Sequence, residues 1–231
     1  MTALLPRWSP GQAIGLLGGS FDPPHQGHLL ISRLAIKSLR LDRLWWLVTP
    51  GNPLKSTNRL PDLRSRIGAA RALARDPRIA VTGFEAAIGA RFTCDTVLWL
   101  KRRAPGVRFV WIMGADNLSQ FHLWRRWREI AAQVPILVVD RPGSTTRALA
   151  SHAGLALARF RLHEYDAARL ARRAPPALLF LHGPRSPLSS TSLRRAARRR
   201  AAPLEKPPQA GHLGQLGGPA NRRGPARRLP P

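Results

Sequence analysis

This 231-residue sequence has one cysteine and few acidic residues. The single cysteine, Cys94, cannot form an intramolecular disulfide, so an extracellular domain held by disulfides is not indicated. No motif places a histidine beside Cys94, and we expect a buried structural thiol. No apolar run approaches the roughly 18 residues of a membrane span, and the first residues lack the apolar stretch of a signal peptide. We therefore expect a cytoplasmic protein without a membrane partner.

The shortage of acidic residues leaves a large excess of positive charge. Lys and Arg number 38 against 12 Asp and Glu, for a formal net charge of +26 at pH 7. Such a charge suits polyanionic partners, since phosphate neutralisation supplies most non-specific nucleic-acid affinity. Almost all of it is Arg in a chain rich in Ala, Leu and Pro, which codon bias can produce. We expect no dedicated nucleic-acid partner, although a basic nucleic-acid-binding protein stays open as an alternative.

Apolar runs of strand length alternate with longer segments of helical period, which is typical of α/β folds. The sequence predicts a doubly wound parallel sheet of about five to six strands with helices on both faces. The predicted strands are residues 13–17, 43–49, 78–82, 107–113, 135–139 and 177–181, and the predicted helices are 27–40, 62–75, 93–103, 124–133, 145–158 and 191–200.

Composition divides the chain into three parts. Residues 12–200 carry the alternating pattern and are predicted to form one domain. Residues 1–11 are an N-terminal extension. Residues 201–231 are dense in Pro, Gly and Arg without an apolar period, so they cannot bury enough surface to offset the entropy of ordering, and we expect a disordered basic tail.

The segment IGLLGGSFDPPHQGHLLI, residues 14–31, is the most informative. Its apolar run ends in Gly18 and Gly19, which let a ligand approach the backbone closely. The Pro-Pro pair delays the next helix, so that His25 and His28 flank its first turn. A helix N-terminus at the carboxyl edge of a sheet binds anions, and two imidazoles there suit a phosphate on which charge develops.

Two further roles compete for these histidines. The segment is neither a Walker loop nor a GxGxxG dinucleotide-binding fingerprint. His25 and His28 could be capping or packing residues, and an HxxH spacing can also ligate zinc. No third and fourth ligand of suitable spacing stands out, so no metal site is assigned.

The motif GGSFDPPHQGH closely resembles the signature of the HxGH nucleotidyltransferases, which have a Rossmann-like fold. PLSSTSLRR, residues 187–195, resembles their second signature. The intervening segments WWLVTPGNPLKS, RFTCDTVLWL, WIMGADNLSQFHLW and VVDRPG are similar to those of nicotinate-nucleotide adenylyltransferases, the enzymes that join nicotinate mononucleotide to the AMP part of ATP during NAD biosynthesis. The resemblance covers about residues 12–200.

The resemblance implies that ATP enters with Mg²⁺ and lies over the first strand-to-helix loop, with His25 and His28 as catalytic residues. Asp116 would accept hydrogen bonds from the ribose, although a helix N-cap is its competing role. Arg194 could bind the β- and γ-phosphates beside a capped helix start. The implied ATP-binding residues are Gly18, Gly19, Ser20, Phe21, His25, His28, Asp116, Ser189, Ser190, Thr191 and Arg194.

For nicotinate mononucleotide, the resemblance implies a pocket formed by Lys55, Thr93, Trp124 and Arg125. Thr93 would hold the carboxylate and Trp124 would stack on the pyridine ring, whereas Arg125 stands where many relatives carry an aromatic residue. Nicotinamide mononucleotide and phosphopantetheine adenylyltransferases stay open as alternatives, although His25 argues against the latter, which usually carry Thr there. A homo-oligomer also stays open.

Overall fold

The computed structural model describes residues 5–51, 60–140 and 145–183, and within them a seven-stranded sheet has the order β3-β2-β1-β4-β5-β7-β6. Every neighbouring pair of strands is parallel. The strands are β1 (Ala13–Gly19), β2 (Arg43–Val48), β3 (Ile79–Thr82), β4 (Arg108–Gly114), β5 (Ile136–Val139), β6 (Arg161–Leu162) and β7 (Leu178–Leu181). The six predicted strands are confirmed. The predicted strand number was too low because β6 has two residues, fewer than an apolar run needs to be recognised.

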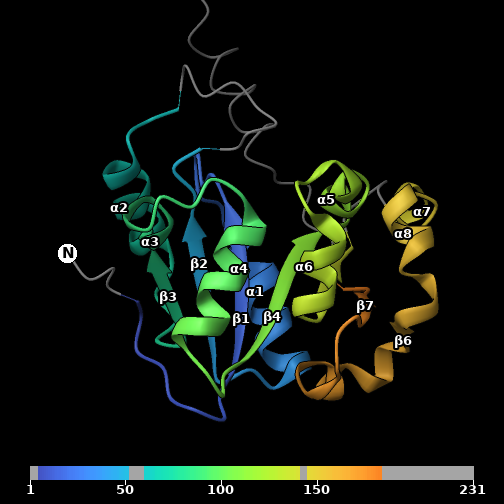
Figure 1. Cartoon of the computed structure of the whole chain (residues 1–231). Coiled ribbons are helices and arrows are strands. Elements are labelled where there is room, and N and C mark those ends of the chain that lie inside the picture. The colour runs from blue at the N-terminus through green and yellow to red at the C-terminus, as the bar shows by residue number, and fades with distance from the viewer. Residues whose placement is uncertain (1–4, 52–59, 141–144, 184–231) are drawn as a thin grey trace, which may run out of the picture.

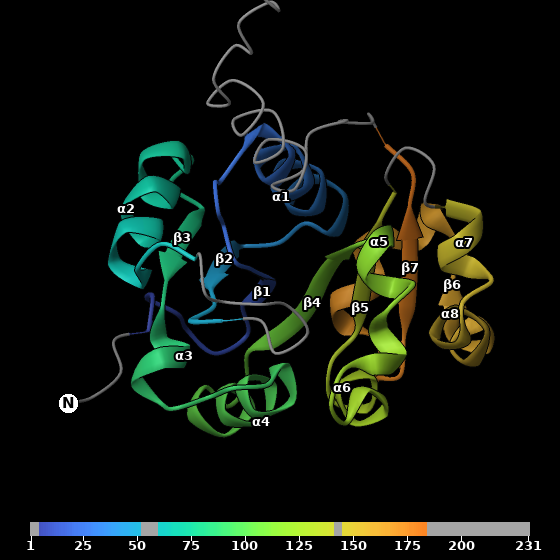
Figure 2. The same ribbon diagram turned by 90° about the horizontal axis from the view of Figure 1, so that it is seen from above.

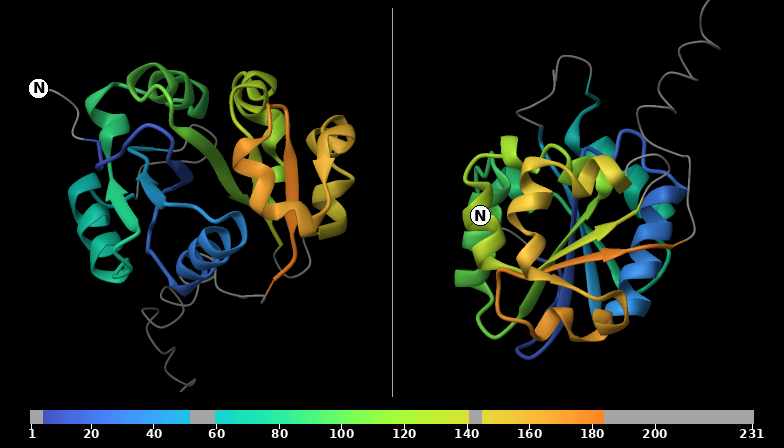
Figure 3. Two further views of the ribbon diagram at one scale, coloured as in Figure 1. Left: turned by 90° about the horizontal axis from the view of Figure 1, so that it is seen from below. Right: turned by 90° about the vertical axis from the view of Figure 1, so that its right-hand side faces the viewer.

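Helices cover both faces of the sheet, as Figures 1 and 2 show. Helix α1 (Gln26–Leu39) lies on one face with the 3₁₀ segment η3 (Glu164–Arg172), and α4 (Thr93–Arg103) and α6 (Trp127–Gln133) lie on the other. Figure 3 shows the twisted sheet between these two layers. The remaining helical segments are α2 (Leu63–Leu73), α3 (Phe84–Ala87), α5 (Ala115–Leu118), η1 (Phe121–Leu123), α7 (Thr145–Leu149), α8 (His152–Ala156) and η2 (Ala158–Phe160).

Alternation along the strands divides the core into two layers. In β2, Trp45 points into the layer under α4 and α6, whereas Trp46 points into the layer under α1, and both side chains are fully buried. The same alternation repeats in β1, β4, β5 and β7, because successive strand residues face opposite sides of a sheet. Each of these five strands is thus apolar on both faces, which explains their continuous apolar runs.

The direction of winding reverses between β1 and β4. From β1 the chain moves outward to β2 and β3, and it then returns to place β4 on the other side of β1. The strands β1 and β4 are parallel neighbours that run toward the top of Figure 1, so the segments that follow them leave the same edge next to each other. In open α/β sheets this reversal at the carboxyl edge is where ligands bind.

The predicted helices 27–40 and 62–75 differ from the structure by one or two residues at their ends, and two others differ more. Residues 145–158 are not one helix, because Ser151 caps a new helix, accepting a hydrogen bond from Gly154 N through its hydroxyl. A Cβ on Gly154 would overlap the carbonyl oxygen of Ala148, so only glycine allows α7 and α8 to pack this closely. Helix α6 begins at Trp127 rather than at residue 124, because Arg126 adopts a left-handed conformation with φ of 56°.

The termini are described only in part. Within the N-terminal extension, Leu5 and Trp8 pack against the core layer under α4 and α6. The predicted helix 191–200 and the predicted tail 201–231 lie outside the described residues. Among the helices that the structure describes, none is long and apolar enough to cross a membrane.

Candidate active site

The side chains of His25 and His28 cap the N-terminus of α1. His25 is the N-cap, with extended backbone angles (φ −151°, ψ 168°), and its Nδ1 accepts a hydrogen bond from Gly27 N at 3.1 Å. In return, His28 Nδ1 accepts a hydrogen bond from His25 N at 3.2 Å. This is a capping box in which both side chains are histidines. The ring centroids lie 3.9 Å apart.

The cap determines which nitrogen of each ring carries the proton. A ring nitrogen that accepts a hydrogen bond is unprotonated, so each neutral imidazole has its proton on Nε2. His25 is buried and His28 is half-buried, which limits the freedom of both rings. The capping role considered from the sequence is therefore confirmed, and capping leaves each Nε2 as the hydrogen-bond donor of its ring.

Aromatic rings fix His28 from the side. Phe21, which is 1% exposed, lies with its ring centroid 4.6 Å from that of His28 and stacks on Trp46 at 5.0 Å. Trp46 Nε1 donates to Ser32 Oγ, and Ser32 Oγ donates to the carbonyl of His28, both at 2.8 Å. The backbone of Phe21 has a φ of 48°, a strained conformation for this residue, which the buried packing of its ring maintains.

Gly18 and Gly19, which precede this loop, pack closely against aromatic rings of the core. A Cβ on Gly18 would lie 2.9 Å from the ring of Trp111, and a Cβ on Gly19 would lie 3.3 Å from the ring of Phe21. Close packing therefore explains the absence of a side chain at Gly18, in addition to the close approach of a ligand that the sequence predicts there.

Asp116 lies at the same edge of the sheet as the histidine loop, after the neighbouring strand β4. It follows β4 directly and is half-buried in the first turn of α5. The N-cap of α5 is Gly114, so Asp116 does not have the capping role that competed with ribose binding. Because β4 pairs with β1, Asp116 and the histidine loop leave the same edge of the sheet on adjacent strands.

Thr93 and the segment that carries Trp124 and Arg125 lie on the face of the sheet that α4 and α6 cover. Thr93 is the first residue of α4, whose N-cap, Phe92, makes no side-chain capping bond. The guanidinium of Arg125 lies over the ring of Phe92, 4.7 Å from its centroid, and connects the start of α4 to the segment that carries Trp124. The half-buried Trp124 ring meets that of Trp111 edge-on at 6.2 Å. Trp124 thus packs partly in the core and exposes the rest of its ring.

Comparison with known proteins agrees with a nucleotide-binding site at this edge. A cytidylyltransferase-like family model matches residues 16–196. A relative from Methylorubrum extorquens strain PA1, named "probable nicotinate-nucleotide adenylyltransferase", is 60% identical over 181 residues, covering 78% of this chain and 98% of the relative. The chain belongs to the nicotinate-nucleotide adenylyltransferase family. A relative from Brucella suis biovar 1 with the same name is 53% identical over 188 residues, covering 81% of this chain and 97% of the relative.

Solved structures share the fold of this adenylyltransferase family member. Nicotinic acid mononucleotide adenylyltransferase of Plasmodium falciparum, complexed with NaAD, matches with a TM-score of 0.57 and 16% identity, covering 80% of this chain and 83% of that chain. The same enzyme complexed with APC matches with a TM-score of 0.56. The family resemblance and the α/β parallel-sheet architecture expected from the sequence are thereby confirmed.

Several predicted site residues lie outside the described residues. They are Lys55, Ser189, Ser190, Thr191 and Arg194. The structure brings the other predicted residues to the carboxyl edge of β1 and β4 and to the start of α4. Within residues 5–51, 60–140 and 145–183, no group of three or more His, Cys, Asp or Glu side chains could hold a metal ion.

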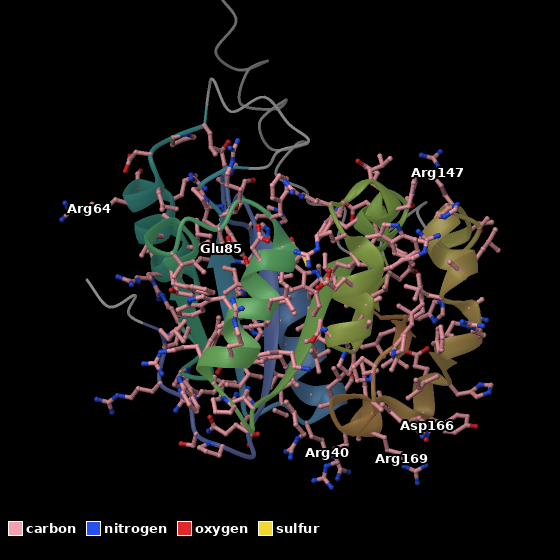
Figure 4. All side chains as sticks on the ribbon, viewed as in Figure 1. Arg40, Arg64, Glu85, Arg147, Asp166 and Arg169 are labelled. Atoms are coloured by element: carbon pink, nitrogen blue, oxygen red, sulfur yellow. The ribbon has the colours of Figure 1, made fainter. Side chains whose placement is uncertain are left out.

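The sequence did not reveal two buried charged residues near this edge. Arg66, on α2, donates to backbone carbonyls of the segments that follow β1 and β2. Glu85, on α3, accepts a hydrogen bond from Thr96 Oγ1 at 2.7 Å and also bonds the side chain of Thr49. In Figure 4, Glu85 lies among the ribbons of the sheet and α4, whereas Arg64 points outward. Both buried residues stand in ordinary helical positions, so no sequence motif distinguished them.

Cys94 matches its expected structural role. Its side chain is 1% exposed within the core layer under α4 and α6. Burial, with the nearby Glu129 carboxylate as a second cause, raises the pKa of the Cys94 thiol. The thiol therefore stays protonated and is a poor nucleophile at neutral pH.

The buried carboxyl of Glu85 predicts a pH dependence of stability. Burial raises the pKa of Glu85 above its ordinary value, so the folded protein favours the protonated form. Its contribution to stability is full below the unfolded-state pKa, about 4.3, and is lost as the pH rises toward the folded-state pKa. Relative to Glu85→Gln, the wild-type protein should therefore lose unfolding free energy with increasing pH.

Urea unfolding of wild type and Glu85→Gln between about pH 4 and about pH 8 measures this difference. Asp95→Asn removes an exposed carboxylate from α4 and serves as the matched control. Parallel pH profiles of wild type and Glu85→Gln would contradict the assignment.

Proposed function

We propose that this protein transfers the adenylyl group of ATP to nicotinate mononucleotide, forming nicotinate adenine dinucleotide and pyrophosphate in a step of NAD biosynthesis. The observation that carries the proposal is the double-histidine cap at the carboxyl edge of β1, in which each ring uses Nδ1 as an acceptor and therefore has Nε2 as its donor nitrogen. Near-complete coverage of relatives named for this reaction supports the choice of substrates.

The reaction needs no covalent enzyme intermediate. An oxygen of the nicotinate mononucleotide phosphate attacks the α-phosphorus of ATP, a new phosphorus–oxygen bond forms, and the bond to the β-phosphate breaks as pyrophosphate leaves. Catalysis then consists of positioning the two phosphates and stabilising the charge that develops. Mg²⁺ enters as part of the MgATP substrate, bound through phosphate oxygens and water.

The side chains divide this work between the two substrates. His25 and His28 donate through Nε2 to phosphate oxygens of ATP, and the positive N-terminus of the 14-residue α1, which has no acidic residue in its first turn, adds to the attraction. Asp116 accepts from ribose hydroxyls. Trp124 stacks on the pyridine ring, and Thr93 binds the nicotinate carboxylate together with backbone amides near Trp124. The single cysteine is buried and forms no disulfide, which fits a reaction in the cytoplasm.

Substrate choice is tested by pyrophosphate release. Purified protein with ATP and Mg²⁺ is offered nicotinate mononucleotide, nicotinamide mononucleotide or phosphopantetheine, and the product is identified by mass. We expect rapid release with nicotinate mononucleotide and formation of the dinucleotide. Release with only one of the other acceptors would overturn the assigned second substrate, and no release with any of the three would overturn the proposed activity.

Substitution of His28 separates its chemical role from its capping role. His28→Ala should lower kcat by about a hundredfold, as loss of a transition-state donor does. His28→Gln restores an acceptor for His25 N, since Gln is common at this capping-box position. It should therefore recover the stability lost by Ala while kcat stays at least about tenfold below wild type.

Steady-state kinetics and thermal unfolding on the same samples make this comparison. His163→Ala, an exposed histidine beside the edge strand β6, is the matched control and should behave as wild type. If His28→Gln regained full turnover together with stability, His28 would be only a capping residue.

A further inference from the structure

The guanidinium of Arg66 is buried and faces backbone carbonyls. The residue is 3% exposed, and its Nε donates to Pro61 O at 2.8 Å. One terminal nitrogen, NH1, donates to Ser20 O and to Thr49 O, both at 2.8 Å, and NH2 reaches Pro50 O at 3.4 Å. All three nitrogens of the planar group thus contact main-chain oxygens rather than a paired carboxylate.

The carbonyls that Arg66 holds belong to segments at the proposed site. Ser20 lies in the loop between β1 and His25, and Thr49 and Pro50 follow directly on β2. Ser20 and Arg66 are 46 residues apart in the sequence, so this contact fixes a loop to a distant helix. Burial lowers the pKa of Arg66, while the charges of Asp22 and Asp62 act in the opposite direction.

Thr49 extends this connection to the second-substrate side. Its backbone N–H donates to Gly19 O at 3.0 Å, which fastens the end of β2 to the end of β1. Its hydroxyl donates to Gly51 O at 2.8 Å and also interacts with the Glu85 carboxyl, which accepts a hydrogen bond from Thr96, one turn beyond Thr93 on α4. A polar path, buried at Thr96, Glu85 and Arg66 and half-buried at Thr49 and Ser20, therefore runs from α4 to the loop that carries the histidines. It passes through Thr96, Glu85, Thr49, Arg66 and Ser20.

We propose that Arg66 is a positioning residue for adenylyl transfer, which holds the Ser20 and Thr49 carbonyls so that the histidine loop meets the reacting phosphate in line. This inference rests on the proposed function. The loop between β1 and α1 lies beyond the sheet's ladder, so its path depends on contacts such as this one. A displacement of about 1 Å at a reacting centre can cost about a hundredfold in rate. Lysine cannot replace the planar fork, because a single ammonium cannot reach several separate carbonyls in one plane.

The kinetic test compares Arg66→Lys with Arg64→Lys. Arg64 is exposed on the same helix, two residues away, and undergoes the same chemical change. We expect Arg66→Lys to lower kcat about tenfold or more at saturating substrates, with both KM values within about threefold of wild type. Arg64→Lys should match wild type.

A double-mutant cycle with His28→Ala distinguishes positioning from a general loss of stability. If Arg66 acts by placing the histidine loop, its substitution should cost much less in the absence of His28, so that the two losses in kcat are not additive. Full multiplication of the two losses would overturn the proposal, as would an unchanged kcat in Arg66→Lys.

Hydrogen exchange provides a readout that does not require activity. Under native conditions, Arg66→Lys should accelerate exchange in peptides that cover residues 19–28 and 49–51, and leave β5 and β7 unchanged. Uniform acceleration across the sheet would mean that Arg66 only stabilises the fold, and would overturn the proposal. If wild type released no pyrophosphate, the proposed function would fail, while local or uniform exchange would still decide whether Arg66 holds these segments.

Discussion

The reciprocal hydrogen bonds between two imidazoles and the first turn of α1 are the constraint on which the proposed chemistry depends. A free histidine ring exchanges its proton between two nitrogens, but His25 and His28 each use Nδ1 as an acceptor for a backbone N–H. Each ring therefore has one tautomer and a restricted orientation. The helix start and the donor geometry are a single feature, and the Pro-Pro pair ahead of His25 fixes where that helix begins.

Contacts from the sheet, the core and α2 hold this capped helix start in place. The parallel sheet delivers β1 and β4 to one edge, where the histidine loop and Asp116 lie on adjacent strands. Phe21, Trp46 and Ser32 hold His28 from the core side. Arg66 fixes the carbonyls of the connecting segments from α2. Two tryptophans and a phenylalanine, from β4 and the η1 segment, pack together on the opposite layer.

The sequence predicted what local chemistry determines. Six strands were recognisable because each is buried on both faces and reads as an apolar run, and the histidine pair was recognisable because glycines and prolines limit the backbone around it. The two-residue strand β6 and the break at Ser151 gave no such signal. Arg66 and Glu85 could not be found, since their partners lie in distant segments: Arg66 bonds carbonyls 16 and 46 residues away. Their role exists only once the chain has folded.

Nitrogen-15 NMR of the histidine rings tests the central claim most directly. In the free protein, at a pH where the rings are neutral, the imidazoles of His25 and His28 should both be Nε2–H tautomers with unprotonated Nδ1 atoms. Binding of a non-hydrolysable ATP analogue should shift both Nε2–H signals and leave those of His163 in place. Nδ1–H tautomers in the free protein, or Nε2–H signals that do not respond to the analogue, would contradict the account.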